Sequence, residues 1–510
     1  MEQVVWFVWA ATVAFALVYY QLLTRRHRGK GRSPPCPGPR PLPLLGNMLD
    51  LRGDLHHTLA RLAGTHGPVM MLKLGLTTTV VVSSRDAAKE AYTKHDRHLA
   101  ARAVPDAATA AGYAKRSMVW LPSSDPLWKT LRGTVASNVF SPRGLAAARG
   151  VHERKVRDIV AYFRRRAGQE VDVGQALYGG ALNLVSSAFV SVDLVDVGAR
   201  GHGLKEIVED LVAAIAKPNV SDLFPFLRPL DLQGWRRWAR GHYDKVFGVL
   251  GSIVDVRLAA DAKARTKTDT AGKHQAAGDF LDSLLELVSA GKISRDIVVA
   301  ILFDVFTAGS EAIAVTVVWA IAELIQNPRM MAKVRAEMQQ VLGRRHDAAI
   351  GELDAANLLY LQAVVKEAMR LHPVAPIMLP HQAVAEGVEL GGYAVPKGST
   401  VIFNVWAIMR DPRVWERPDE FVPERFMDMA DKVEFHGKDF QFIPFGSGRR
   451  ICPGLPMAER VVPFILASLL HTFEWRLPDG VSADEFQVTE KFSYVNTLAI
   501  PLKAVPVVIV

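Results

Sequence analysis

A short segment near the C-terminus places one cysteine in surroundings suited to a thiolate. Cys452 lies in Phe445-Gly-Ser-Gly-Arg-Arg-Ile-Cys-Pro-Gly454, whose glycines let backbone come close to a flat ligand. The apolar run 455–470 predicts a helix, so the thiol would stand at a helix N-terminus, where the dipole lowers a thiol pKa. Arg449 and Arg450 favour the anion in the same way. A buried structural cysteine is the alternative, but it would need neither the glycines nor the arginines.

The spacing of Phe445, Gly448, Arg450, Cys452 and Gly454 resembles the haem-binding loop of the cytochrome P450 family. In that family the cysteine is the axial thiolate of the haem iron, and its electron donation favours O–O cleavage. The resemblance implies that Cys452 ligates the iron of haem b and that the other four residues belong to the haem-binding site.

The sequence predicts a long buried helix from Ser294 to about Gln326, which ends before Asn327-Pro328 because the residue preceding a proline disfavours the helical conformation. Residues 297–306 are apolar nearly all round, which indicates burial on every side. The segment Thr307-Ala-Gly-Ser-Glu-Ala312 then places a glycine and a carboxylate inside this helix, where both are costly. A helix kink with a hydrogen-bonded glutamate is the alternative to a functional role.

Residues 307–312 resemble the oxygen-binding segment of the same family. The resemblance implies that Gly309 opens space over the iron and that Glu311, with a threonine, organises the water that protonates dioxygen. In this chain the threonine position is Ala312, which has no hydroxyl. Ordered water or a substrate hydroxyl filling this gap is the outcome we favour; poor coupling with loss of peroxide, or chemistry without O–O cleavage, are the alternatives. Three nearby hydroxyls lie on other faces or turns of the helix and are not simple substitutes: Thr307, Ser310 and Thr316.

A glutamate and two arginines further along the chain predict a structural cluster. Glu367 and Arg370 are three residues apart on one face of a predicted helix, and alone they would be an ordinary surface pair of little energetic value. Followed by Phe421-Val-Pro-Glu-Arg-Phe426, they resemble the buried Glu–Arg–Arg cluster of the family. The resemblance implies that Glu367, Arg370 and Arg425 hold the cysteine loop against the core.

Four further residues are candidates for contact with the haem propionates. Trp128-x-x-x-Arg132 places an indole and a guanidinium one helical turn apart, a weak motif that contacts a propionate in this family. The resemblance implies that Arg450 and His381 are the other partners. Taken alone, His381 would be interpreted as a surface histidine.

The N-terminus has the composition of a membrane anchor. Residues 4–23 carry no charge and would span roughly 30 Å as a helix, the thickness of a bilayer core. The basic residues between 25 and 32 favour a cytoplasmic position for the rest of the chain, whereas a cleavable signal peptide would carry its charges before the apolar run. Residues 33–43 are too rich in proline for helix or sheet and indicate a stiff connector, in which Cys36 is incidental.

The remaining sequence predicts one mainly helical catalytic domain with small β-sheets. The expected organisation is an anchor over 1–24, a basic and proline-rich hinge over 25–45, and a haem-binding domain over 46–510. Within the domain we expect a hairpin over 69–84, helices from 86 to about 371 with a loop-like segment over 260–278, and a second β-rich region over 377–403. The net charge of +9 is modest, and no motif indicates nucleic-acid binding. The resemblance implies the cytochrome P450 fold and the endoplasmic reticulum membrane as location.

Two segments extend the resemblance to the geraniol-hydroxylase-like plant microsomal branch: 217–234 and 279–285. It implies a monooxygenase that hydroxylates a lipophilic substrate, a mono- or diterpenoid, with electrons from NADPH-cytochrome P450 reductase. Substrate walls are expected at 100–121, along the helix face 301–312, and at 374–379 and 494–498. The alternatives are a haem-thiolate isomerase or dehydratase that needs no external electrons, and a non-catalytic haem protein.

Overall fold

The computed structural model describes Trp6, residues 9–10 and 12–14, and then 33–198, 203–267, 279–343, 349–428, 433–480, 486–493 and 495–509. Apart from those few positions, the expected anchor over 1–24 and the hinge up to residue 32 lie outside the described residues. Backbone contacts divide the chain into two compact units. We call them the sheet unit (1–103, 218–233 and 377–408) and the helical unit (104–217, 234–376 and 409–510).

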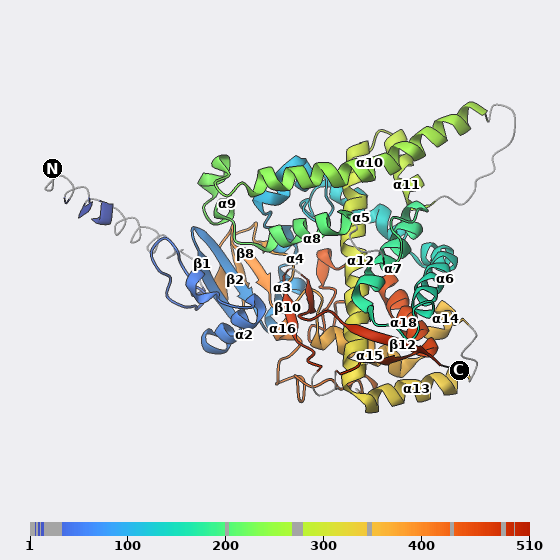
Figure 1. The fold of residues 1–510 in the computed structure, drawn as a ribbon. Coiled ribbons are helices and arrows are strands. Elements are labelled where there is room, and N and C mark those ends of the chain that lie inside the picture. Colours follow the sequence, from blue (N-terminus) through green and yellow to red (C-terminus); the bar gives the residue numbers. More distant parts are fainter. Residues whose placement is uncertain are drawn as a thin grey trace. The chain divides into compact units, whose positions relative to one another are not determined.

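The sheet unit is built on a five-stranded sheet with the order β1-β2-β8-β5-β3 (Figure 1). The predicted hairpin is confirmed: β1 and β2 pair antiparallel with Val69 opposite Val82, and Gly75 in the turn has φ +59°, a conformation that favours glycine. The second β-rich region is confirmed as well, and its strand β8 runs parallel to β2. The strands of this unit are β1 (Val69–Leu74), β2 (Thr77–Val82), β3 (Ala101–Arg102), β5 (His381–Gln382), β6 (Val388–Leu390), β7 (Tyr393–Val395) and β8 (Thr400–Phe403). Its helices are η1 (Met48–Asp50), α2 (Leu55–His66), α3 (Arg85–Lys94), α4 (Asp96–Leu99), α9 (Val220–Leu223), η3 (Pro225–Leu230) and α16 (Val405–Ile408).

The helical unit is organised around α12 (Arg295–Gln326), which packs against α7, α10, α15 and α18 (Figure 1). Its limits confirm the predicted central helix, and it ends at Asn327, before Pro328. Among the described residues α12 is the one helix long and apolar enough to cross a membrane, but most of that apolar surface is buried in the protein, as in a core helix. The other helices are η2 (Asp106–Lys115), α5 (Pro126–Asn138), α6 (Pro142–Arg164), α7 (Val173–Val190), α8 (Gly203–Ala216), α10 (Trp235–Lys267), α11 (Phe280–Ser289), α13 (Pro328–Leu342), α14 (Glu352–Ala355), α15 (Leu359–Leu371), α17 (Arg425–Asp428), η5 (Gly448–Arg450) and α18 (Leu455–Thr472).

Short strands complete the helical unit. One sheet has the order β4-β12-β9 and another pairs β10 with β11. They are β4 (Val171–Asp172), β9 (Phe473–Arg476), β10 (Glu490–Phe492), β11 (Asn496–Leu498) and β12 (Lys503–Val508). The predicted class, mainly helical with small sheets, is confirmed.

One expectation about the connections is wrong. The segment from residue 260 was expected to be loop-like, but α10 continues to Lys267, and 268–278 lie outside the described residues. The segment 258–267 is rich in alanine, lysine and arginine, which are strong helix formers. A lack of bulky apolar residues removes a reason for burial, and it does not remove helix propensity.

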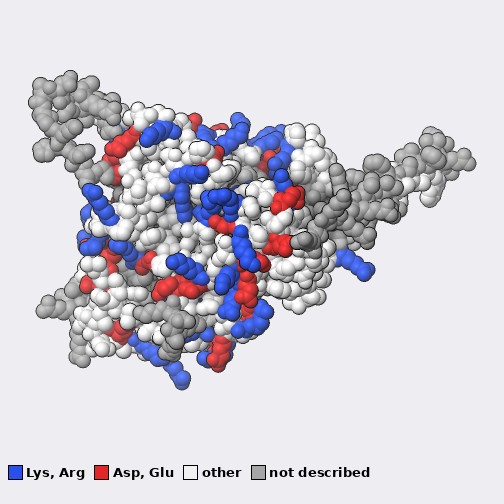
Figure 2. All heavy atoms as spheres, turned by 180° about the vertical axis from the view of Figure 1, so that it is seen from behind, with Lys and Arg blue, Asp and Glu red and all other residues white. Residues whose placement is uncertain are grey.

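Charged side chains of both signs share the surface. The sequence has 61 lysines and arginines and 52 aspartates and glutamates, and on the face drawn in Figure 2 the two signs are interspersed. Some form local pairs, such as Arg257 with Asp279 at 2.9 Å and Asp282 at 2.6 Å. On that face, recognition of a partner would therefore depend on local pairs more than on a single-sign field.

Candidate active site

The cysteine loop is held mainly by its backbone. Gly446 and Gly448 have φ of +74° and +65°, in the left-handed region that favours glycine. The Cys452 amide donates a hydrogen bond to Phe445 O at 2.9 Å, which closes the loop. Gly454 is the N-cap of α18, so Cys452 stands just before a helix N-terminus, as predicted.

The pKa of the Cys452 thiol is determined by burial and by neighbouring donors. Cys452 is only half-buried, although protein atoms surround it densely enough for burial to raise the pKa of its thiol. The N–H groups of Gly454 and Leu455 and the charge of Arg132 lower that pKa, but by less. The predicted lowering is therefore outweighed by burial in the free thiol. A coordinated metal ion would reverse this balance, because a coordinating thiol is deprotonated outright.

Trp128, Arg132 and Arg450 gather beside this loop. Trp128 Nε1 donates to Met118 O at 3.1 Å, and the Arg450 guanidinium lies over the Trp128 ring at 5.0 Å. Arg132 donates to Ile451 O, next to the cysteine. Burial lowers the pKa of Arg132, and the thiolate form of Cys452 would raise it. The three side chains thus provide hydrogen-bond donors and positive charge near a thiol, which suits an anionic group; their contact with propionates remains a prediction.

The central helix is mostly buried, but residues between 305 and 315 keep accessible surface. Most of α12 between residues 298 and 324 is buried. Thr307, Gly309 and Glu311 are half-buried, and accessible surface is also kept by Val305, Ala308, Ala312 and Val315. The spacing of three and four residues between the last four places them on one side of the helix. We call these four residues the open stripe. Two of its members are alanines, so the stripe offers room for an apolar ligand.

Gly309 does not belong to the open stripe. A Cβ at this position would lie 3.3 Å from a methyl group of Val185 on α7, closer than most such contacts. The glycine therefore allows α7 and α12 to pack closely, and its role of opening space over the iron remains a prediction. The small residue on the accessible face is its neighbour, Ala308.

Glu311 has the environment of a proton-exchanging group. Burial raises its pKa to about 7, with Glu209 of α8 acting in the same direction and Lys205 of α8 opposing it. A carboxyl group with this pKa can hold and release a proton near neutral pH. Its predicted role in proton delivery is therefore chemically possible, although its access to a ligand remains a prediction.

The hydroxyls near Ala312 do not replace the missing threonine. Ser310 Oγ donates to Phe306 O at 2.5 Å, and Thr316 Oγ1 donates to Ala312 O at 2.7 Å. Both hydroxyls are thereby bound to the carbonyl one turn earlier. Thr307 Oγ1 is buried without a hydrogen-bond partner and lines a small, largely apolar pocket between α7, α8, α10 and α12.

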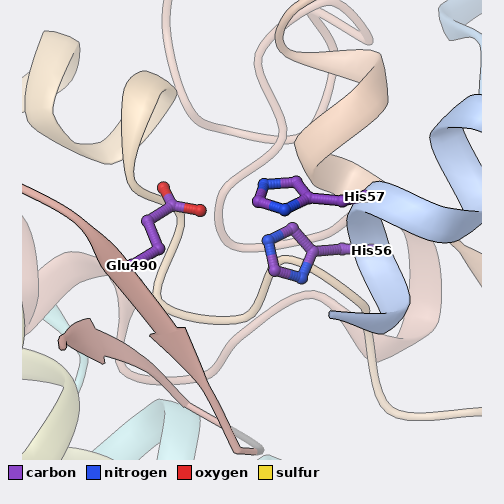
Figure 3. A group of neighbouring side chains, drawn as sticks. All are labelled: His56, His57 and Glu490. Carbon is purple, nitrogen blue, oxygen red and sulfur yellow. The ribbon is translucent and has the colours of Figure 1, made fainter. Parts of the chain in front are cut away.

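His381 belongs to the sheet unit, where it is buried on β5. Its Nδ1 lies 2.7 Å from Leu99 O, and its ring stands edge-on to Phe403 at 5.2 Å. These contacts exclude the simple surface histidine that the isolated residue suggested. The same unit contains two adjacent histidines on α2, His56 and His57, whose ring centroids are 4.0 Å apart (Figure 3).

The predicted Glu–Arg–Arg cluster is present. Arg370 binds Glu367 through two hydrogen bonds of 2.7 and 2.9 Å, and Arg425 Nε adds a third at 3.0 Å. Glu367 and Arg370 are fully buried. Arg370 also donates to the carbonyls of three residues in the segment before the cysteine loop: Met409, Pro418 and Glu420. Each charged group of the cluster is therefore ion-paired and hydrogen-bonded, which buried charges require.

A row of aromatic rings connects this cluster to the cysteine loop. Trp415 lies against both arginines and is 5.7 Å from the Phe426 ring. Successive centroid distances of 5.0, 6.1 and 5.4 Å then lead through Phe442 and Phe435 to Phe445. This packing gives a physical path by which the cluster supports the loop. The sequence interpretation identified the charges but not the rings.

A second buried cluster was missed. His372 Nε2 lies 2.6 Å from Glu323 Oε1, its Nδ1 lies 2.9 Å from Glu490 Oε1 (Glu490 is labelled in Figure 3), and its ring stacks on Trp319 at 3.9 Å. Asp304 of α12, also missed, accepts hydrogen bonds from residues 191 and 187 positions earlier in the chain. In both cases the partners are remote in sequence, and no local sequence pattern predicts these contacts.

The chemistry of this site fits a haem with an axial thiolate. The helical unit supplies a half-buried cysteine beside two backbone N–H groups, a half-buried arginine and an indole at its side, and a helix with an open apolar stripe. The helix α12 packs against α18, which directly follows the cysteine.

Comparisons with known proteins agree with this fit. The sequence model of the family described as Cytochrome P450 matches residues 36–499. The chain is 62% identical over 508 residues to a protein of Oryza sativa named Cytochrome P450 76M5, with 98% of each chain covered. It is 58% identical to the ent-cassadiene C11-alpha-hydroxylase 1 of the same species, with 99% of each chain covered. It is 40% identical to a geraniol 8-hydroxylase of Swertia mussotii, over 96% of this chain and 97% of that relative.

Proposed function

The chain belongs to the cytochrome P450 family, and from this premise we propose that it hydroxylates a terpenoid, with a diterpenoid as the first candidate. The observation that carries the proposal is the open stripe of α12, where Ala308 and Ala312 leave room along an apolar face. A bulky hydrocarbon substrate matches such a face. The relative at 58% identity named for ent-cassadiene supports the larger substrate class over the monoterpenoid suggested by the more distant geraniol hydroxylase.

Cys452 would hold the haem iron through its thiolate, with the amides of Gly454 and Leu455 stabilising that charge. Trp128, Arg132 and Arg450 would bind the propionates. When bound, the haem supplies the activation of dioxygen and the transfer of one oxygen atom to a C–H bond. Because the enzyme is a P450 monooxygenase, electrons come from NADPH through a reductase.

The protein's own contribution on the oxygen side is to exclude bulk water and to deliver protons. Glu311 is placed to exchange a proton near neutral pH, since its pKa is about 7. Ala312 offers no hydroxyl, and Ser310 and Thr316 are bound to backbone carbonyls. We therefore assign the last step of proton delivery to an ordered water or to a hydroxyl of the substrate.

The test is reconstitution of the full chain with a plant NADPH-cytochrome P450 reductase and a panel of mono- and diterpenoids. We expect a product with one added oxygen atom that depends on NADPH and on the reductase. Turnover without either component would instead support the electron-independent isomerase or dehydratase. Absence of any oxidised terpenoid, with an intact thiolate spectrum, would overturn the substrate class.

We also propose attachment to the endoplasmic reticulum membrane. Residues 1–24 would form the anchor, and the sheet unit exposes apolar side chains where the chain leaves the hinge and near α9 and η3. These are Leu42, Leu44, Leu45, Leu49, Phe226, Leu230 and Leu232. The two regions meet at the β1–β2 turn, since Gly75 N bonds Leu45 O and Leu76 N bonds Leu223 O. Flotation with microsomes should be reduced when residues 1–24 are deleted and lost when Phe226 and Leu230 are also replaced by serine; binding equal to that of the full chain would refute this.

Arg449 is exposed on the cysteine loop and would help to dock the reductase. Such docking should weaken steeply with salt. An electron-transfer rate that stays the same between low and high salt would contradict it.

A further inference from the structure

Asp304 is a carboxylate in the middle of the apolar helix α12, and its residue is only 4% exposed. Its Oδ1 accepts hydrogen bonds from Tyr113 Oη at 2.5 Å and from Ser117 Oγ at 2.8 Å, and its Oδ2 accepts one from the Met118 amide at 2.8 Å. The Val119 amide donates to Ser117 Oγ at 3.0 Å, which leaves the serine hydrogen directed at the carboxylate. All these donors come from η2 and the connection between η2 and α5.

Neutral donors alone hold this carboxylate. Among the described residues, no lysine, arginine or histidine forms an ion pair with Asp304. Burial of an unpaired carboxylate is expensive, and an apolar side chain would suit the surrounding helix surface better. Burial raises the pKa of Asp304 to about 7, and its hydrogen bonds lower it in part. The side chain is best explained by the backbone that it holds in place.

The same backbone is held from its other side by the residues beside the cysteine loop. Met118 O accepts from Trp128 Nε1 at 3.1 Å and from Arg450 Nη1 at 3.3 Å. Arg450 also donates to the carbonyls of Val119 and Leu121. One amide and two side-chain hydroxyls of the segment therefore bind Asp304, while its carbonyls bind the side chains expected at the haem propionates.

We propose that Asp304 is a positioning residue that determines substrate specificity by fixing the segment 113–121. The residue next to it, Val305, begins the open stripe, so the segment and the stripe are set at a fixed spacing by one side chain. The segment would then act as a wall of the substrate space and also as a support for Trp128 and Arg450. This inference deepens the proposed function and rests on it for the identity of the substrate.

The test compares Asp304→Ala, Asp304→Asn and Tyr113→Phe in the full-length holoenzyme. Asp255→Asn is the matched control, because its carboxylate also accepts two hydrogen bonds, from Arg295 at 2.6 and 2.7 Å, but is exposed on α10. Three quantities are measured: amide hydrogen exchange of 113–121, binding of imidazole and phenylimidazole by optical titration, and the ratio of hydroxylated products from ent-cassadiene.

In Asp304→Ala we expect exchange of the 113–121 amides to rise by about tenfold or more, as for the loss of more than one hydrogen bond. Affinity for phenylimidazole should change by several-fold while imidazole is unaffected, and the product ratio should shift. Asp304→Asn and Tyr113→Phe should give smaller changes in the same direction. A variant that folds with the full thiolate spectrum but matches Asp255→Asn in all three quantities would overturn the proposal.

The outcomes separate this proposal from the proposed function. Changed exchange and changed phenylimidazole binding, in an enzyme that oxidises no terpenoid, would refute the substrate class and support the positioning role. Terpenoid oxidation with the same product ratio and the same exchange in every variant would refute the positioning role alone. If Asp304→Ala does not fold, Tyr113→Phe tests the positioning role in its place, because this variant removes one hydroxyl and keeps the ring.

Discussion

The cysteine loop and the central helix differ in what forms the site: the backbone in the loop, and side chains on the helix. Around Cys452 the backbone itself forms the site, through two glycines with positive φ, a closing hydrogen bond and N–H groups at a helix start. On α12, by contrast, the backbone is an ordinary helix and its function depends on which side chains meet neighbouring elements.

This contrast explains where the chain keeps the family pattern and where it departs from it. Replacing either glycine would strain a backbone that needs positive φ, and replacing the cysteine would remove the thiolate; no neighbour could compensate for either loss. Proton delivery can use a carboxyl group, a hydroxyl or a water, so the loss of the hydroxyl at Ala312 can be compensated by a neighbouring group. The iron side is therefore specified locally, and the oxygen side is specified by several elements together.

The largest effect is expected from Cys452→Ala, which removes the sole thiolate of the helical unit's site. The reduced carbon monoxide complex should lose the red-shifted Soret band of a thiolate ligand, and turnover should stop. Cys36→Ala is the matched control: this thiol is buried in the sheet unit, where it donates to Ala394 O at 3.5 Å. A preserved thiolate band in Cys452→Ala, or its loss in Cys36→Ala, would contradict the assignment.

The second effect tests whether the cysteine loop depends on its support. Glu367→Ala would leave Arg370 and Arg425 buried without their carboxylate, a change that typically costs about 3–5 kcal/mol. Denaturant unfolding should show this loss, together with poor haem retention. Glu420→Gln should cost less than about 1 kcal/mol, because its carboxylate forms only an exposed pair with Arg417. Equal unfolding free energies in the two variants would argue against the cluster as a support.

The two regions also differ in how far the sequence predicts them. The cysteine loop, the central helix and the three charges of the cluster follow from residues close together in sequence or from a family pattern. Asp304 was included in an apolar run, and its partners at 113–118 could not be inferred without the fold. The environment of Glu311 depends in the same way on Lys205 and Glu209 of α8. Periodicity predicts which elements form, but it does not predict which remote side chains meet across them.

The third effect concerns proton delivery. Glu311→Gln should lower the coupled hydroxylation rate by about 10²-fold, the usual contribution of one general acid. With a pKa of about 7, the wild-type glutamic acid is protonated below neutral pH, so product formed per oxygen consumed should fall as pH rises from 6 to 8. Glu209→Gln should move this midpoint to lower pH, because Glu209 raises the pKa of Glu311. A pH profile that is unchanged in Glu311→Gln would exclude the glutamate.

The raised pKa of Glu311 also predicts how the free energy of unfolding changes with pH. The pKa of Glu311 in the folded protein lies above the usual 4.5, so ionisation of Glu311 destabilises the native state. The contribution of Glu311 to the free energy of unfolding therefore falls as pH rises from 4.5 to about 7. Glu311→Gln should remove that slope in denaturant titrations. An unaltered slope would place the titrating group elsewhere.

The fourth effect tests whether the missing hydroxyl matters. Ala312→Thr should reduce peroxide released per NADPH only by about two- to fivefold, since an ordered water serves almost as well as a direct hydrogen bond. Ser310→Ala is the control, because that hydroxyl is bound to Phe306 O and should not influence coupling. A fall in peroxide of about 10²-fold in Ala312→Thr would mean that the natural enzyme is poorly coupled.

The smallest effect separates two neighbours on the helix. Gly309→Ala gains about 1 kcal/mol of helix propensity. It also brings a methyl group to 3.3 Å from Val185, and crowding of this kind typically costs about 1–3 kcal/mol. The free energy of unfolding should therefore change by no more than about 2 kcal/mol, and carbon monoxide binding should be unchanged. Ala308→Val should leave the free energy of unfolding unchanged but weaken phenylimidazole binding, because it enlarges a residue on the open stripe. If Gly309→Ala instead blocked ligand binding, the glycine would face the ligand. Gly309 would then serve the oxygen side through its missing side chain alone. The contrast between an iron side built locally and an oxygen side built by several elements would be weaker.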